Sequence, residues 1–251
     1  MSRVLSSGTA VGLRDYQEDR YLSISAEEGL VLMIADGHGG ASCSDTIAKA
    51  FPKVWADMWD GFKNPIEALI DVFATIDNLT RQNRAGSTLT VVFIPKTFDT
   101  AYVAICGDSP VIINQPDGTL WVSPEHNVRT NIVERDLAIR RGGIYERGYI
   151  WNDSPYSDNA RGLQMSRAMG DPHMGSRILH LPEIKQVPLG DWLLAGSDGL
   201  VDPGHVGGEG SSTPEKMAEM IDGGADADEL VDFAVKLPTH DNVTAILWRR
   251  N

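Results

Sequence analysis

Short apolar runs separated by turn residues occur throughout the first half of the chain, and they predict pairs of antiparallel strands. The segments between them contain residues that favour chain reversal, such as the sequence Pro116-Asp117-Gly118. The predicted hairpins are residues 20–25 with 30–35, 88–95 with 100–106, and 110–114 with 119–123. Two later apolar runs, 192–195 and 243–248, predict further strands.

Helical periodicity occurs in two separate blocks. In the first block, residues 39–59 have helical spacing, and Asn64 followed by Pro65 is typical of a second helix start. The apolar residues after this start fall on one helical stripe, namely Ile66, Leu69, Ile70, Phe73 and Ile76. The second block opens at Thr213-Pro214 and continues to Leu237.

The separation of strand runs from helix pairs predicts an α+β fold in which helices cover two packed antiparallel sheets. No linker divides the chain, so we expect one domain over residues 1–251. The segment of about 125–161 is rich in Arg, Asn, Asp and Gly and has little apolar periodicity, which indicates a surface flap over a site. Residues 204–212 have the composition of a plain loop.

Composition narrows the function classes. Among 251 residues, Asp and Glu number 35 against 22 Lys and Arg, so the net charge is −13. This charge argues against nucleic acid or an anionic membrane as a partner, and phosphate would be bound through cations. The two cysteines, Cys43 and Cys106, form no disulfide framework, and no apolar run approaches the roughly 20 residues of a membrane span. We therefore expect a soluble, cytoplasmic protein.

Aspartates stand at the ends of several predicted strands. Asp36, Asp108 and Asp198 each end an apolar run, and Asp241 with Asn242 directly precedes the last one. Each alone is typical of a turn, but a partly buried cluster of acids repels unless cations neutralise it. Carboxylates are hard ligands that select Mg²⁺ or Mn²⁺ over Zn²⁺. Two such ions can activate water and hold a phosphate, which indicates a metal-dependent phosphoryl hydrolase.

Ordered segments from about Gly8 to Trp248 share a pattern with a known family. They are Arg14-Asp15-Tyr16-Gln17-Glu18-Asp19, Ala35-Asp36-Gly37-His38-Gly39-Gly40, Gly86-Ser87-Thr88, Cys106-Gly107-Asp108-Ser109, Ser166-Arg167-Ala168-Met169-Gly170-Asp171, Ser197-Asp198-Gly199-Leu200 and Asp241-Asn242-Val243-Thr244. In these segments the chain resembles the metal-dependent protein Ser/Thr phosphatases of the protein phosphatase 2C type. One departure is Pro110, where the family usually carries Arg.

The resemblance implies a four-layer α-β-β-α sandwich of two antiparallel sheets flanked by helix pairs. It also implies a binuclear Mg²⁺ or Mn²⁺ centre in which Asp36 bridges both ions. Asp198 and Asp241 would hold one ion, and Glu18 with the backbone carbonyl of Gly37 would hold the other.

Further roles follow from the same resemblance. Asp19 matches an outer-shell acid that orients metal-bound water, and Asp108 and Asp202 match the positions of a weaker third ion site, together with Asp198. Arg14 matches the phosphate clamp, although a surface ion pair with Asp15 or Glu18 would also account for an arginine there.

The implied reaction is hydrolysis of phosphoserine and phosphothreonine on proteins. A metal-bridging hydroxide would attack phosphorus directly, and His38 would act as the general acid that protonates the leaving oxygen. Asp171 and Arg167 are expected to organise the core near the site. The expected partners are phosphorylated proteins, the targets of Ser/Thr kinases, and the expected state is a monomer.

Two alternatives remain open at this point. A pseudophosphatase would keep the fold as a phospho-binding module, but each of Asp36, Asp198 and Asp241 is present. A nuclease or small-molecule phosphoesterase would share the metal chemistry, but a nuclease needs a basic groove and the charge of −13 opposes it.

Overall fold

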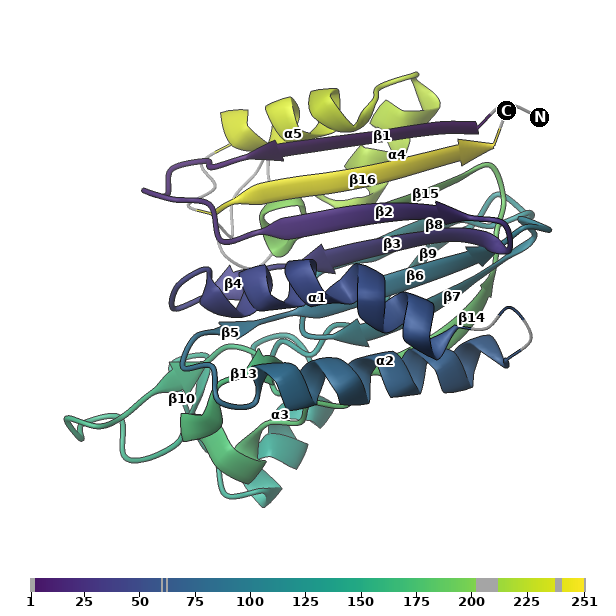
Figure 1. Ribbon diagram of the computed structural model, residues 1–251. Helices are drawn as coiled ribbons and strands as arrows, with labels where there is room; N and C mark the ends of the chain where they lie inside the picture. The colour runs from purple at the N-terminus through teal and green to yellow at the C-terminus, as the bar shows by residue number, and fades with distance from the viewer. Residues whose placement is uncertain (1–2, 60, 62, 202–211, 238–240, 251) are drawn as a thin grey trace.

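Two five-stranded antiparallel sheets form the centre of the computed structural model, which describes residues 3–59, 61, 63–201, 212–237 and 241–250 (Figure 1). The first sheet has the order β14 (Glu183–Pro188), β7 (Thr100–Cys106), β6 (Leu89–Pro95), β3 (Gly29–Ala35) and β2 (Arg20–Ala26). The second has the order β1 (Arg3–Ala10), β16 (Val243–Arg250), β15 (Trp192–Gly196), β8 (Val111–Asn114) and β9 (Leu120–Val122). The predicted hairpins and later strands are confirmed.

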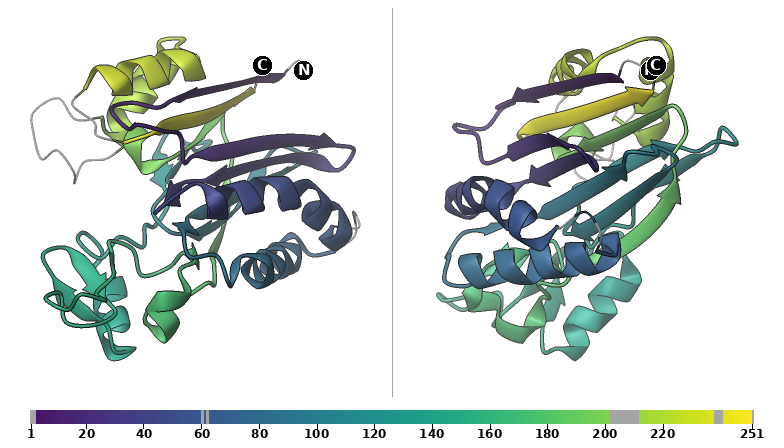
Figure 2. Two further views of the ribbon diagram at one scale, coloured as in Figure 1. Left: turned by 60° about the vertical axis from the view of Figure 1, so that its left-hand side comes forward. Right: turned by 45° about the vertical axis from the view of Figure 1, so that its right-hand side comes forward.

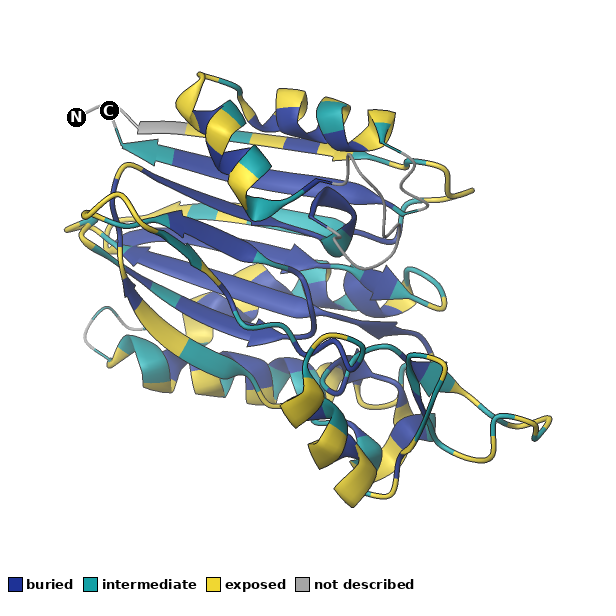
Figure 3. Ribbon diagram, turned by 180° about the vertical axis from the view of Figure 1, so that it is seen from behind, coloured by how far each residue is buried: buried dark blue, intermediate teal, exposed yellow. Residues whose placement is uncertain are grey.

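Strand β3 shows how the layers are built. All seven of its residues are buried, because alternate side chains point to opposite faces and both faces are covered. Leu32 and Ile34 pack in the core between the two sheets, together with Trp248 of β16. Val31 and Met33 pack in a second core, against the first pair of helices. Figure 3 shows the central strands as buried over most of their length.

Helix pairs cover the outer faces of both sheets and give the four layers α-β-β-α. Helices α1 (Ser42–Met58) and α2 (Pro65–Thr80) pack on the first sheet, and α4 (Pro214–Asp222) and α5 (Ala227–Lys236) pack on the second. As predicted, Asn64 caps α2 by accepting a hydrogen bond of 2.9 Å from the backbone N–H of Ile66. The α+β sandwich implied by the resemblance is therefore confirmed.

The second helical block consists of two helices joined by a glycine turn, which agrees with the expected helix pair. Helix α4 ends at Gly223-Gly224, and Gly224 has a φ of +102°, which favours glycine. Helix α5 then starts with a capping box between Asp226 and Glu229.

The segment of about 125–161 contains regular structure that its composition did not predict. Helix α3 (Ile132–Arg140) packs beside a small sheet of β10 (Ile144–Glu146), β11 (Tyr149–Trp151) and β12 (Gly162–Leu163), of which β12 follows directly after the segment. This lobe has its own apolar core and projects from the sandwich (Figure 2). The predicted loop at 204–212 lies, except for Ser212, outside the described residues.

Short elements complete the fold near the sheet edge. They are β4 (Gly37–His38), β5 (Gly86–Ser87), β13 (Met169–Gly170) and the 3₁₀ turns η1 (Pro172–Arg177) and η2 (Asp198–Leu200). Strands β13, β5 and β4 pair in that order and bring distant segments together. In the described part of the chain, every helix is too short or too polar to cross a membrane.

Candidate metal centre and active site

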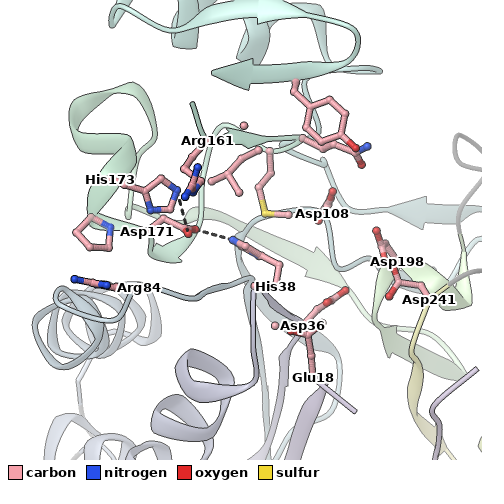
Figure 4. A pocket seen from close by; sticks show the side chains of 18 of the residues that line it. Glu18, Asp36, His38, Arg84, Asp108, Arg161, Asp171, His173, Asp198 and Asp241 are labelled. Carbon is pink, nitrogen blue, oxygen red and sulfur yellow. Dashed lines mark hydrogen bonds and ion pairs between the residues drawn. The ribbon is translucent and has the colours of Figure 1, made fainter. Parts of the chain in front are cut away.

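The aspartates that were predicted at strand ends line one cavity of about 720 Å³. Asp36 and Asp108 follow strands β3 and β7 of the first sheet, while Asp198 follows β15 and Asp241 precedes β16 of the second. The cavity therefore lies where the ends of both sheets meet. Figure 4 shows these carboxylates with Glu18 on one side of the cavity.

Asp36 lies at the electrostatic centre of this group. Burial, followed by the negative charges of Asp19, Asp198 and Asp241, raises its pKa well above the usual range. Within the described ranges, no three His, Cys, Asp or Glu side chains are already grouped closely enough to hold a metal ion. Asp36, Asp198 and Asp241 share one cavity and their negative charges repel one another, and a bound cation would relieve that repulsion.

Asp19 and Asp108 are buried carboxylates, and in each of them one oxygen accepts a hydrogen bond while the other has none. Asp19 accepts a hydrogen bond of 2.7 Å from Thr244 through Oδ2, and Asp108 accepts one of 2.9 Å from Asn127 through Oδ2. The Oδ1 atom of each is buried and has no hydrogen-bond partner among the described residues. Burial raises the pKa of both carboxyl groups. Buried oxygens of this kind are costly unless compensated, so this donor set fits a hard divalent cation.

Glu18 and Gly37 are held together by close packing. Glu18 is 5% exposed, and its Oε1 accepts a hydrogen bond of 2.5 Å from the backbone N–H of Gly40. A Cβ atom at Gly37 would lie 2.7 Å from Ser44 Oγ and 2.8 Å from the carbonyl oxygen of Glu18. Only glycine therefore fits beside Glu18 at this point of the cavity wall.

Arg14 forms ion pairs with two of the predicted metal ligands. Its Nη2 lies 2.7 Å from Asp241 Oδ2, and its Nη1 lies 3.8 Å from Glu18 Oε2. The alternative of an ion pair with Glu18 thus has structural support. The predicted role as a phosphate clamp stays a prediction, and the guanidinium does line the cavity in which a phosphate would bind.

His38 is joined to Asp171 by a hydrogen bond of 2.6 Å between Nε2 and Oδ2. Burial lowers the pKa of His38, but the hydrogen bond and charge of Asp171, with the charges of Asp108 and Glu18, raise it overall. Asp171 is 2% exposed and has a left-handed backbone with a φ of +53°. Asp171 was expected to organise nearby core, and the structure places it in direct contact with the predicted general acid.

Asn242 is a site residue to which the sequence analysis gave no role. Its Oδ1 accepts a hydrogen bond of 2.8 Å from the backbone N–H of Glu18. Its Nδ2 donates to the carbonyl oxygens of Val11 and Tyr16, at 2.8 Å and 3.1 Å. Asn242 therefore fixes the loop that carries Arg14 and Glu18. The available signal was its position beside Asp241 in a shared motif.

Asp202, predicted at the third ion site, lies outside the described residues. The structure does place Asp108 in the shared cavity. Tyr149 and Arg161 from the segment of about 125–161 also line this cavity, together with Arg84 and His173. His173 carried no functional prediction, and only the fold brings it to the site.

Several known proteins are similar to this chain in sequence. The family model described as "Protein phosphatase 2C" matches residues 14–203. An Arabidopsis thaliana relative, "Probable protein phosphatase 2C 5", is 29% identical over 188 residues, which are 68% of this chain and 44% of that protein. A relative in Oryza sativa subsp. japonica, "Probable protein phosphatase 2C 45", is 25% identical. The alignment with it covers 97% of this chain and 85% of that protein.

Solved structures show the same fold. The serine-threonine phosphatase 2C of Toxoplasma gondii aligns with a TM-score of 0.74 at 18% identity, over 98% of this chain and 94% of that one. A structure described as a C. elegans sex determining protein aligns with a TM-score of 0.80 at 21% identity, over 99% of this chain and 65% of that one. The chain spans less than half of the Arabidopsis relative above, at 44% of its length.

Proposed function

The chain belongs to the protein phosphatase 2C family, and from this premise we propose that it hydrolyses phosphoserine and phosphothreonine in proteins with the help of Mg²⁺ or Mn²⁺. The observation that carries the proposal is the meeting of Asp36, Asp198, Asp241, Arg14 and His38 in one cavity. Glu18 and Asp108 add further carboxylate oxygens to the same cavity, and the buried Oδ1 of Asp19 would orient a metal-bound water from the outer shell.

The carboxylates would hold the cations. Asp36 would contact two ions, with Asp198 and Asp241 on one and Glu18 with the Gly37 carbonyl on the other. Bound there, the ions would neutralise the acidic cavity, stabilise charge on the phosphoryl group and lower the pKa of a water.

The remaining roles belong to side chains of this chain. Arg14 would orient the phosphoryl oxygens, because a guanidinium fork matches two oxygens of the group. Glu18 and Asp241 hold Arg14 at the cavity, at 3.8 Å and 2.7 Å. Asp171 contacts the imidazole of His38 at Nε2, and its charge favours the protonated ring, from which His38 would transfer a proton to the departing serine or threonine oxygen.

A phosphate-release assay on a phosphothreonine peptide tests the proposal. We expect release in Mg²⁺ or Mn²⁺ and background in EDTA, and we expect Asp198→Asn to lose the metal-dependent release. Asp191→Asn, at an exposed position outside the cavity, is the matched control and should behave as wild type. Folded protein that releases no phosphate with either metal would contradict the proposal and favour the phospho-binding module instead.

A further inference from the structure

The active-site cavity has two ends of opposite charge. Figure 4 shows the carboxylates of Asp36, Asp198 and Asp241 on one side and the cationic side chains of Arg84 and Arg161 on the other. The proposed phosphate chemistry uses the acidic end and Arg14. It leaves the basic end without a role.

Neither arginine at the basic end has a carboxylate partner in the part of the chain that the structure describes. Arg84 follows helix α2, is exposed, and makes no hydrogen bond or ion pair with any residue in the described ranges. The Nη1 of Arg161 donates to the carbonyl oxygen of Ala160 at 2.8 Å, and no described carboxylate pairs with this guanidinium.

Some other arginines of the chain do have carboxylate partners. Arg20 pairs with Asp45 at 2.8 Å, and Arg81, three positions before Arg84, pairs with Asp77 at 3.3 Å. With 35 acidic residues in the chain, acidic partners are abundant. Arg84 and Arg161 nevertheless line the cavity without a described carboxylate partner, so both guanidinium groups are available to an anion of a ligand.

The acid nearest this end is already engaged. Asp171 is buried and bonded to His38 at 2.6 Å, and its other oxygen lies 3.9 Å from Nε2 of His173. Figure 4 shows Asp171 between His38 and His173. The carboxylate of Asp171 interacts with these histidines, and no ion pair between it and Arg84 or Arg161 is present among the described residues.

We propose that Arg84 and Arg161 form a second anion subsite of the active cavity, which binds a carboxylate or a second phosphate on the same phosphorylated polypeptide. The inference rests on the proposed function, because it assigns part of the substrate to the other end of the same cavity. Guanidinium groups bind carboxylate and phosphate through paired hydrogen bonds. A local basic end also offsets the repulsion that a chain with a net charge of −13 exerts on an acidic substrate.

The test compares four phosphothreonine peptides of equal length. Their flanking residues are all alanine, contain glutamate, contain lysine, or contain a second phosphothreonine. We expect kcat/KM for the glutamate or the doubly phosphorylated peptide to exceed that for the alanine peptide by about tenfold, since charge-assisted contacts are of that strength. The arm with the larger gain identifies the source of the anion. Equal kcat/KM for all four peptides would overturn the proposal.

Variants of Arg84 and Arg161 test whether these two side chains cause the preference for acidic peptides. In the double variant Arg84→Gln with Arg161→Gln, the ratio of kcat/KM between acidic and alanine peptides should fall to about one, and most of the change should lie in KM. In the double variant Arg84→Glu with Arg161→Glu, kcat/KM should be higher for the lysine peptide than for the glutamate peptide. Arg81→Gln is the matched control and should keep the wild-type ratio. A double variant that keeps the wild-type ratio would contradict the assignment.

Binding separates failure of this inference from failure of the proposed function. The fluorescence anisotropy of each labelled peptide is measured with the intact protein, whether or not turnover occurs. If no peptide is hydrolysed but the acidic peptide binds more tightly and loses that advantage in the double variant, the subsite stands and the phosphatase proposal fails. If the alanine peptide is hydrolysed and acidic groups improve neither binding nor turnover, the subsite fails and the phosphatase proposal stands.

Discussion

His38 Nε2 lies 2.6 Å from Asp171 Oδ2, although the two residues are 133 positions apart in the chain. Gly86 lies directly against this contact, because a Cβ there would be 1.9 Å from Asp171 Oδ2 and 2.1 Å from His38 Nε2. These residues sit on β4, β5 and just after β13, which pair as one small sheet. The missing side chain at Gly86 is thus what allows the histidine and the aspartate to meet.

Gly86→Ala should therefore damage turnover more than stability. The added methyl group must push His38 and Asp171 apart, and a displacement of about 1 Å near the reacting groups lowers rates about 100-fold. Steady-state kinetics with a phosphothreonine peptide measure the effect, and a thermal melt checks the fold. Gly223→Ala is the control, since Gly223 has a φ of −74° and its nearest neighbour would be 3.3 Å from the new Cβ. Wild-type kcat in Gly86→Ala would refute the role of the contact.

His38→Ala should show a strong dependence on the leaving group. A serine or threonine oxygen leaves poorly without a proton, whereas para-nitrophenolate leaves readily without one. We expect a loss of roughly 100-fold or more in kcat on a phosphothreonine peptide and a much smaller loss on para-nitrophenyl phosphate. Equal losses on the two substrates would show that His38 is not the general acid.

The pair of Glu134 and Arg167 should hold helix α3 against the segment that precedes β13. Glu134 on α3 is 5% exposed, and its Oε1 lies 2.6 Å from Arg167 Nη2, while Ser166 donates a hydrogen bond to Oε2. Burial raises the pKa of Glu134, but the hydrogen bonds from Arg167 and Ser166 outweigh it, so the net pKa lies below the usual 4.5.

Glu134→Gln should lower the free energy of unfolding by about 3 kcal/mol near neutral pH, because it leaves Arg167 without its charged partner. A lowered folded pKa means that the stabilisation is complete above pH 4.5 and is lost as the pH falls through the folded value. Urea unfolding should therefore show a difference from wild type that narrows at acidic pH. Asp57→Asn, in the exposed pair with Lys53, should cost less than about 1 kcal/mol. A difference that widens in acid would contradict this account.

Periodic and local signals in the sequence predicted most of the sandwich. The hairpin of β2 and β3 follows from two apolar runs around a turn, and the start of α2 follows from Asn64 and Pro65. Aspartates at the ends of strands, such as Asp36 and Asp198, predicted a shared site. The reason is geometric, because strand ends of two packed sheets lie at the same edge of the sandwich.

Features that depend on contacts between distant segments were not predicted. Strand β1 was missed because Ser6, Ser7, Gly8 and Thr9 lack the apolar pattern of a strand, and it is held by pairing with β16. A Cβ at Gly8 would lie 2.7 Å from Asp228 Oδ1, so close packing under α5 selects glycine there. The basic end of the cavity was missed for a similar reason, since only the fold brings Arg84 and Arg161 into one cavity.

Calorimetric titration of Mn²⁺ into metal-stripped protein tests most directly whether the carboxylates form a cation centre. The wild-type protein should bind two ions per chain, and Asp36→Asn should lose both, because Asp36 is placed between the acids of the two sheets. Asp191→Asn should bind as wild type. Binding of two ions by Asp36→Asn with unchanged affinity would contradict the assignment of Asp36 as the shared ligand and, with it, the proposed metal centre.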